Sequence, residues 1–433
     1  MGNFIKDFRR SLSGASFESA EVSQVEVEPT HDKPLTQQDV DDVRSHRNEV
    51  REAVEELNDV TKDASDITTV TKAAQMVSQA AETAGKAGQS ASVQSCVMFG
   101  NHAISDATNL LQTELPRLEV DANGVTAASM EGVMSWVADA SKSVWNAAGR
   151  FFERVGISMS RLNKTSLGFH NRIARVQGKM QHRKGNGGKT ISMGSTHRRL
   201  LVLGDGYATA STAGTAISEF SQISLGIVAE LEAYMLKVDS AAKKELMGAL
   251  LKGYDRGESV VDSSEYANKV AHLISSQPAH LLGNERYEFK ETRNKSRILN
   301  CELVVGHPPA VELIKHLDPI KSLTHEEVGH VLSAVSQVVT HQTTQLQKII
   351  KSTDAAFSQI RNVIHNLTEE KFTEDGYAGS DTHAADLHRL IRLENTLVDE
   401  LGAIAQSMAR HQNDLVQRID AVLSLAEESV FQD

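Results

Sequence analysis

Cysteine, proline and aromatic residues are scarce in this chain of 433 residues, and each shortage excludes a class of structure. The two cysteines, Cys96 and Cys301, are too few for a disulfide framework or a multi-cysteine metal site, which favours synthesis in a reducing compartment. Seven prolines leave long stretches free to form helices. With aromatics at 5%, the composition favours helices that pack through aliphatic seams.

Long hydrophobic runs are also missing. No stretch approaches the ~18 to 20 consecutive apolar residues of a membrane span, so we expect no spanning helix. The N-terminus has Gly2 but carries Lys6 where a myristoylation motif needs Ser or Thr. A short amphipathic helix that places Phe4, Ile5 and Phe8 on a membrane surface stays open as an alternative.

Acidic residues are nearly absent from one part of the chain, residues 132–203. Residues 1–131 carry 11 Lys and Arg against 22 Asp and Glu, so they hold most of the net charge of -12. Residues 132–203 reverse the sign, with 13 basic residues and only Asp139 and Glu153 as acids. An acidic region ahead of a basic one can mask it, and removing the first would expose a surface able to bind polyanions.

The pattern along the chain predicts four segments. They are residues 1–131, 132–203, 204–320 and 321–433. In the first, which we call the leader, the polar and proline-containing residues 13–39 predict a disordered linker. Residues 40–115 predict helices with a thin stripe of small apolar side chains, which would pack weakly alone. The stripe begins with Val40, Val43, Val50, Val54 and Leu57.

The second segment predicts an amphipathic helix over residues 133–155 and a glycine-rich loop over residues 183–196. Its seams are Val137, Val144 and Phe151, and Ala148, Val155 and Leu162. Clustered cations without interleaved aromatics would contact nucleic-acid phosphates non-specifically and in a salt-sensitive way. The candidate phosphate contacts are Arg172, Arg175, Lys179, Arg183, Lys184, Lys189, Arg198 and Arg199. A solvated face paired with acids elsewhere, or an acidic protein partner, remains an alternative.

The last two segments complete a mainly α fold, a helical body with a small β-hairpin insertion and a long C-terminal antiparallel helical hairpin. In residues 204–320, helical patterns cover 212–238, 240–254 and 263–275, and the alternation in residues 286–305 predicts the β-hairpin. In residues 321–433, Thr324 and Glu327 form a capping box that opens the first of two long apolar runs. A polar loop containing glycine separates those runs, as in an antiparallel hairpin.

Fragments of catalytic motifs fail on spacing. His325 and His330 are five apart, whereas a zincin helix needs its histidines four apart on one face. The Asn186–Thr190 fragment lacks the first glycine and the preceding strand of a phosphate-binding loop. Gly204 and Gly206 bound a turn without a third glycine in register. We therefore expect no enzymatic activity, no cofactor and no metal.

The end of the leader carries a short motif. Ser129-Met130-Glu131, followed by Gly132, resembles the small-x-Glu signal that maturation proteases of large tailed bacteriophages cut after the glutamate. Two further copies are Ser16-Phe17-Glu18 and Ser19-Ala20-Glu21. The tripeptide also occurs elsewhere by chance, but only at Glu131 does it coincide with a predicted linker, the charge reversal and the start of an aromatic helix. That helix, with Trp136, Trp145 and Phe152, is similar to the start of the mature part of internal head proteins of giant, phiKZ-like or other jumbo phages.

The resemblance implies a virion structural protein made as a precursor in the host cytoplasm. A prohead protease would remove the leader after Glu131, and residues 132–433 would lie inside the phage head, beside other head proteins and possible non-specific DNA contacts. The alternative is an intact cytoplasmic helical adaptor, in which the terminal hairpin and the leader helices bind protein partners. The mass of the protein in its natural source discriminates between the two.

Overall fold

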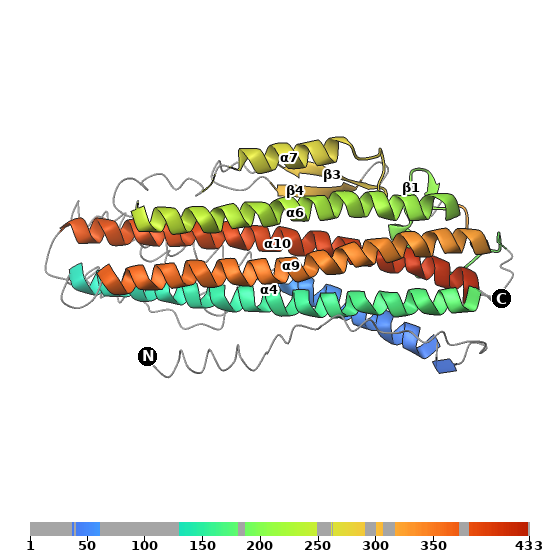
Figure 1. The fold of residues 1–433 in the computed structure, drawn as a ribbon, viewed down its shortest axis with the longest axis horizontal. Helices are drawn as coiled ribbons and strands as arrows, with labels where there is room; N and C mark the ends of the chain where they lie inside the picture. Colours follow the sequence, from blue (N-terminus) through green and yellow to red (C-terminus); the bar gives the residue numbers. More distant parts are fainter. Residues whose placement is uncertain are drawn as a thin grey trace, which may run out of the picture.

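Four long helices lie side by side along the long axis of the molecule (Figure 1). The computed structural model describes residues 37–38, 40–60, 130–180, 187–248, 261, 263–290, 300–305, 317–371 and 381–431. The long helices are α4 (Met130–Met180), α6 (Ala210–Gly248), α9 (His325–Lys371) and α10 (Asp381–Phe431). The mainly helical class expected from the sequence is confirmed.

The predicted C-terminal hairpin is confirmed as α9 and α10. Its capping box forms as expected: the backbone N–H of Thr324 donates to Glu327 Oε2 at 2.6 Å, and the N–H of Glu327 donates to Thr324 Oγ1 at 3.3 Å. The Leu323 N–H donates to Ser429 Oγ at 2.9 Å, which ties the start of α9 to the end of α10 and makes the pair antiparallel. Because α9 packs even more extensively on α4 and α6, the hairpin belongs to a four-helix bundle.

Two helices are longer than the sequence pattern predicted. The helix expected over 133–155 starts at Met130 and continues to Met180, and the helices expected over 212–238 and 240–254 are joined as α6. Neither stretch contains a proline that would break the helix. Packing against the bundle stabilises each helix through residues of modest helix propensity. In α6 the joint is at Asp239, which is buried.

The predicted β-hairpin is present as β3 (Glu285–Lys290) and β4 (Asn300–Val305), paired antiparallel with Tyr287 opposite Leu303. Helix α7 (Ser264–Ser275), also predicted, lies beside this hairpin on the α6 side of the bundle (Figure 1). A second, smaller hairpin was not predicted. It consists of β1 (Val202–Leu203) and β2 (Gly206–Tyr207), which flank the predicted turn and follow the short α5 (Ser195–Leu200).

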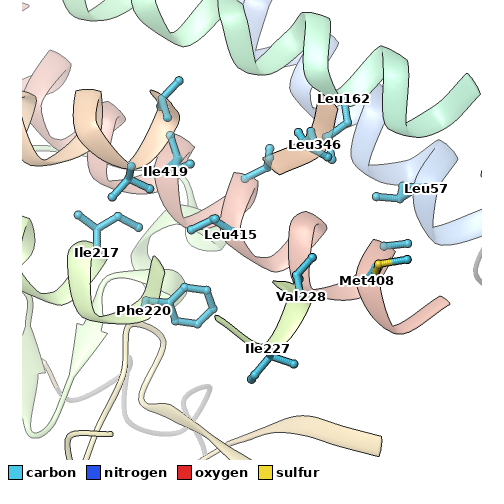
Figure 2. Close-up of a cluster of buried hydrophobic side chains, with 14 of the residues drawn as sticks. Leu57, Leu162, Ile217, Phe220, Ile227, Val228, Leu346, Met408, Leu415 and Ile419 are labelled. Atoms are coloured by element: carbon cyan, nitrogen blue, oxygen red, sulfur yellow. The ribbon is translucent and has the colours of Figure 1, made fainter. Parts of the chain in front are cut away.

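A further helix, residues 40–60 of the leader, lies against α4 on the opposite side of the bundle from α7 (Figure 1). We call it the leader helix. Its side chain Leu57 is fully buried and joins the cluster of Leu162 and Met408 shown in Figure 2. One continuous hydrophobic core contains residues from all four predicted segments, including the predicted seam residues Ala148, Phe151, Val155 and Leu162. Val137 and Val144 lie outside the described side chains.

Candidate functional site

The leader helix packs antiparallel on the second half of α4, and its apolar seam shares Val43, Val50 and Leu57 with the predicted stripe. Val50 and Leu57, one heptad apart, are buried, and Ala53 and Val60 complete the buried stripe. Val40, at the start of the predicted stripe, is exposed. The small side chains allow close approach of the two helices, and the leader helix is thereby part of the core.

Acidic residues of the leader helix pair with basic residues of α4 beside this seam. Arg161 lies 2.6 Å from Glu56 and 3.1 Å from Glu52, and Arg175 lies 2.7 Å from Asp42. These cations keep 48% and 31% of their side chains exposed, so water screens the pairs. A cavity of about 590 Å³ lies beside the Arg161 pair and is lined in part by the exposed Ile157.

The leader helix also contacts α10. Arg47 lies 2.8 Å from the buried carboxylate of Glu427 and 3.5 Å from that of Glu428. Near the other end, Asn413 Nδ2 donates a hydrogen bond of 2.9 Å to Asn58 Oδ1. The site is therefore a groove between α4 and α10, filled by one helix whose register is fixed at both ends.

His46 lies in the middle of the interface between the leader helix and α4. His46 Nε2 lies 2.8 Å from the backbone carbonyl oxygen of Thr165, and its ring meets Phe169 edge-on, with ring centroids 5.1 Å apart. The imidazole fits because residue 168 is glycine: a Cβ there would lie 2.2 Å from His46 Nε2. Burial lowers the pKa of His46, and the charge of Arg172 acts in the same direction.

Arg172 is not a phosphate contact in this fold, which corrects the prediction. Its side chain is 2% exposed and forms a bidentate pair with Glu427 at 2.7 and 2.8 Å. A third bond of 2.6 Å reaches Asp420, which also lies 2.9 Å from His197 of α5. Burial opposes the ionised carboxylate, yet Arg172 and His197 hold the pKa of Asp420 well below its usual range. The network joins α4, α5 and α10.

The other candidate phosphate contacts are dispersed. Arg175 faces the leader helix, and Lys179 is half-buried and engaged in further contacts. Arg198 donates to the Tyr207 hydroxyl at 3.1 Å, and Arg199 lines a cavity of about 270 Å³ beside Asp414. Lys189 is exposed in its loop, and Arg183 and Lys184 lie outside the described residues.

The described part of the glycine-rich loop is paired with the chain before α9. Gly188 N–H donates to the Ser322 carbonyl oxygen at 3.0 Å, Lys189 N–H donates to Ser322 Oγ at 3.1 Å, and Ile191 N–H donates to the Ile320 carbonyl oxygen at 2.9 Å. A phosphate-binding loop needs such amides directed at the ligand. These three are already used to hold the bundle end together.

The predicted cleavage junction lies at the start of α4. Met130, Glu131 and Gly132 are its first three residues, so the flexible linker expected over residues 125–132 ends at least three residues earlier than predicted. Met and Glu are good helix formers, and an acid in the first turn interacts favourably with the helix dipole. Ser129 and the secondary motifs Ser16, Glu18, Ser19 and Glu21 lie outside the described residues.

Within the described ranges, no three His, Cys, Asp or Glu residues are placed to hold a metal ion. His330 instead lies near Glu326 on the exposed face of α9. In the same ranges, no helix combines the length and the apolar character that crossing a membrane requires.

The acids that define the interface were missed by sequence reasoning. A signal existed for Glu52 and Glu56, which are one helical turn apart in a leader already known to be acidic. No local signal pointed to Asp420 or Glu427, because the residue they pair with is about 250 positions away.

Comparison with known protein families, with curated sequences and with solved structures finds no match for this chain. The function is therefore argued from the residues of the chain itself.

Proposed function

We propose that the chain is the precursor of a non-enzymatic structural protein of a tailed-phage head, cut after Glu131 by a prohead protease. One observation carries the proposal: an acidic helix from the leader lies on the basic half of α4 and pairs with Arg161 and Arg175. The leader then acts as a cover that cleavage makes removable.

The charges on the two helices support this role. From Arg154 to Met180, α4 carries six cations and no acid, whereas the leader helix carries seven acids and three cations. Opposite charges on two helices that lie side by side favour docking, and the docked acids lower the attraction of this face of α4 for any polyanion. Before cleavage, the precursor would stay soluble and off nucleic acid.

The predicted junction lies far along α4 from the described contacts of the leader helix. Ser158, which donates a hydrogen bond to Glu56 of the leader helix, is 27 residues after Glu131, or about 40 Å along the helix at 1.5 Å per residue. The first amides of a helix have no partner within it, so its first turn frays at little cost. Cleavage needs only this turn to open, while the leader helix stays in place.

Cutting the chain changes how the leader helix is held. Before the cut its local concentration is set by the connecting chain, and afterwards it binds as a separate molecule. A 21-residue helix with a thin apolar seam is marginal alone, so dilution favours its release. Release would uncover Arg161 and Arg175, and residues 132–433 would then contact other head proteins and, non-specifically, DNA.

Mass spectrometry of purified virions tests the proposal. We expect a mature N-terminus at Gly132, a mass near 33 kDa in proportion to 47.2 kDa for the full chain, and no peptides from residues 1–131. Glu131→Gln should block the cut. The matched control is Glu265→Gln, which alters the same tripeptide pattern at the start of α7 and should leave processing unchanged. Full-length chain in finished particles would contradict the proposal.

The intact adaptor is the second candidate, and one observation favours it: Leu57 of the leader is fully buried in the core shared with the bundle. A segment so integrated would serve a protein that is never cut. In that case the natural source contains only the 47.2 kDa chain, in the cytoplasm and bound to other proteins.

A further inference from the structure

The groove beneath the leader helix is not uniformly basic. Toward the leader helix, α4 presents Arg161 and Arg175, and α10 presents Glu427 and Glu428. The cations and acids are thus equal in number among these contacts. The Arg175 end and the Arg161 end attract negative charge, and the surface near Glu427 attracts positive charge.

Arg47 is the leader residue that supplies positive charge near Glu427. It bridges Glu427, whose side chain is 1% exposed, and Glu428, which is 25% exposed. If the groove is vacated, Glu427 keeps Arg172 but both acids lose Arg47. A nucleic-acid backbone brings only negative charge to that point and is repelled there. A helix that carries one arginine at this register restores the pair.

The shape of the groove also favours a helix over a nucleic-acid backbone. Val50 and Ala53 of the leader helix are almost fully buried against the floor of the groove. The imidazole of His46 lies against Gly168, where the Cβ of any other residue would collide with it. At the far end, Asn413 donates to the Asn58 side chain. These contacts require a regular helix with a small apolar seam.

We infer that the α4–α10 groove is a recognition site for an amphipathic partner helix of mixed charge. The partner presents a Val/Ala/Leu seam, acids toward Arg161 and Arg175, and one arginine toward Glu427 and Glu428. The inference rests on the proposed function only for the event that vacates the groove. It assigns the uncovered face to a protein helix and leaves any DNA contact to cations outside the groove.

The test uses the full chain with a specific protease sequence in place of residues 123–129, so that the cut can be made at will. The probe is a fluorescent peptide of residues 36–60. We expect saturable binding to the cut chain, with release of the original leader, and no binding to the uncut chain, whose own helix occupies the groove at high effective concentration. A cut chain that neither binds nor exchanges the peptide at 100-fold excess would overturn the inference.

Peptide variants give the sign of the effect. Arg47→Ala should weaken binding at least tenfold, because the peptide then brings no positive charge to Glu427 and Glu428. The matched control is Arg51→Ala, which changes the net charge equally but removes a side chain that is 67% exposed and pairs with Glu55 of its own helix. We expect that control to stay within twofold of the parent peptide. On a purely cationic face, both variants would bind more tightly, and this result would overturn the inference.

Competition separates the remaining occupants. A 20-base-pair DNA duplex should fail to displace the peptide at 0.15 M salt, and a second copy of the uncut chain should not displace it either. Displacement by DNA at equal concentration would assign the groove to nucleic acid. Because the cut is engineered, intact chain in natural virions would contradict the proposed function and leave this result unaffected.

Discussion

Helix α4 meets the rest of the molecule across two surfaces of opposite character. Toward the bundle, Phe152 stacks on Phe357 of α9 with ring centroids 4.4 Å apart, and Arg172 is enclosed with its acids. Toward the leader helix, Arg161 and Arg175 reach their partners through solvent-exposed side chains. Cations from one basic run in the sequence thus have two different roles.

The difference is one of solvation. Removing one member of a buried ion pair leaves a charge that water cannot reach, at a cost of about 3 to 5 kcal/mol, whereas an exposed pair contributes about 0 to 1 kcal/mol. The bundle therefore depends on Arg172, and the leader helix depends on neither its pair with Arg161 nor its pair with Arg175. Such a surface can be vacated without unfolding what lies beneath it.

The largest expected effect comes from substituting one arginine on each surface. Arg172→Leu leaves Asp420 and Glu427 without their main partner and should lower the free energy of unfolding by about 3 to 5 kcal/mol. Arg175→Leu removes an exposed pair with Asp42 and should lower it by less than about 1 kcal/mol. Urea denaturation of both variants measures the difference. Equal losses would refute the division of α4 into two surfaces.

A histidine buried in the bundle gives the next largest effect. Burial, together with the charge of Arg410, lowers the pKa of His411 to about 4, and neither ring nitrogen has a hydrogen-bond partner among the described residues. The unfolded chain takes up this proton near pH 6.5 and the folded chain does not. Stability is therefore present above pH 6.5 and falls toward pH 4, by roughly 3 kcal/mol at 1.36 kcal/mol per pKa unit.

The measurement compares unfolding free energies of the parent and His411→Leu between pH 7 and pH 4. Burial raises the pKa of Glu285 and of Asp414, so these carboxyls stabilise the fold as pH falls and partly offset the loss in each protein. The difference between the two curves isolates His411. A difference that stays constant across this range would show that His411 takes up its proton as readily in the folded chain as in the unfolded chain.

A smaller effect is expected from Gly168, the glycine of α4 that faces the leader helix. Gly168→Ala would place a Cβ 2.2 Å from His46 Nε2, so the imidazole must leave and its bond to the Thr165 carbonyl is lost, at about 1 to 2 kcal/mol. The leader helix should then be cleaved faster in limited proteolysis. Gly178→Ala is the matched control, since its Cβ would meet nothing within 4 Å and should stabilise α4 by up to about 1 kcal/mol.

The sequence predicted the elements better than the surfaces. The capping box at Thr324, the hairpin of β3 and β4 and the seam of Val50 and Leu57 follow from local chemistry and spacing, and all are present. The roles of Arg172 and Arg175 could not be predicted, because partners distant in sequence decide which cation is buried. Local propensity also gave no reason for a helix through the joints of α4 and α6, which packing stabilises.

The smallest expected effect concerns the exposed acids of the leader helix. Glu52→Gln with Glu56→Gln removes both partners of Arg161 and should weaken docking by about 1 kcal/mol or less, seen as a few-fold faster proteolysis of the leader helix in low salt. The difference in proteolysis rate between the double variant and the parent should disappear near 1 M salt, where the screening length is about 3 Å. Glu55→Gln is the control, because Glu55 pairs at 4.0 Å with Arg51 of its own helix. If this control accelerates proteolysis equally, net charge and not pairing with α4 holds the leader in place.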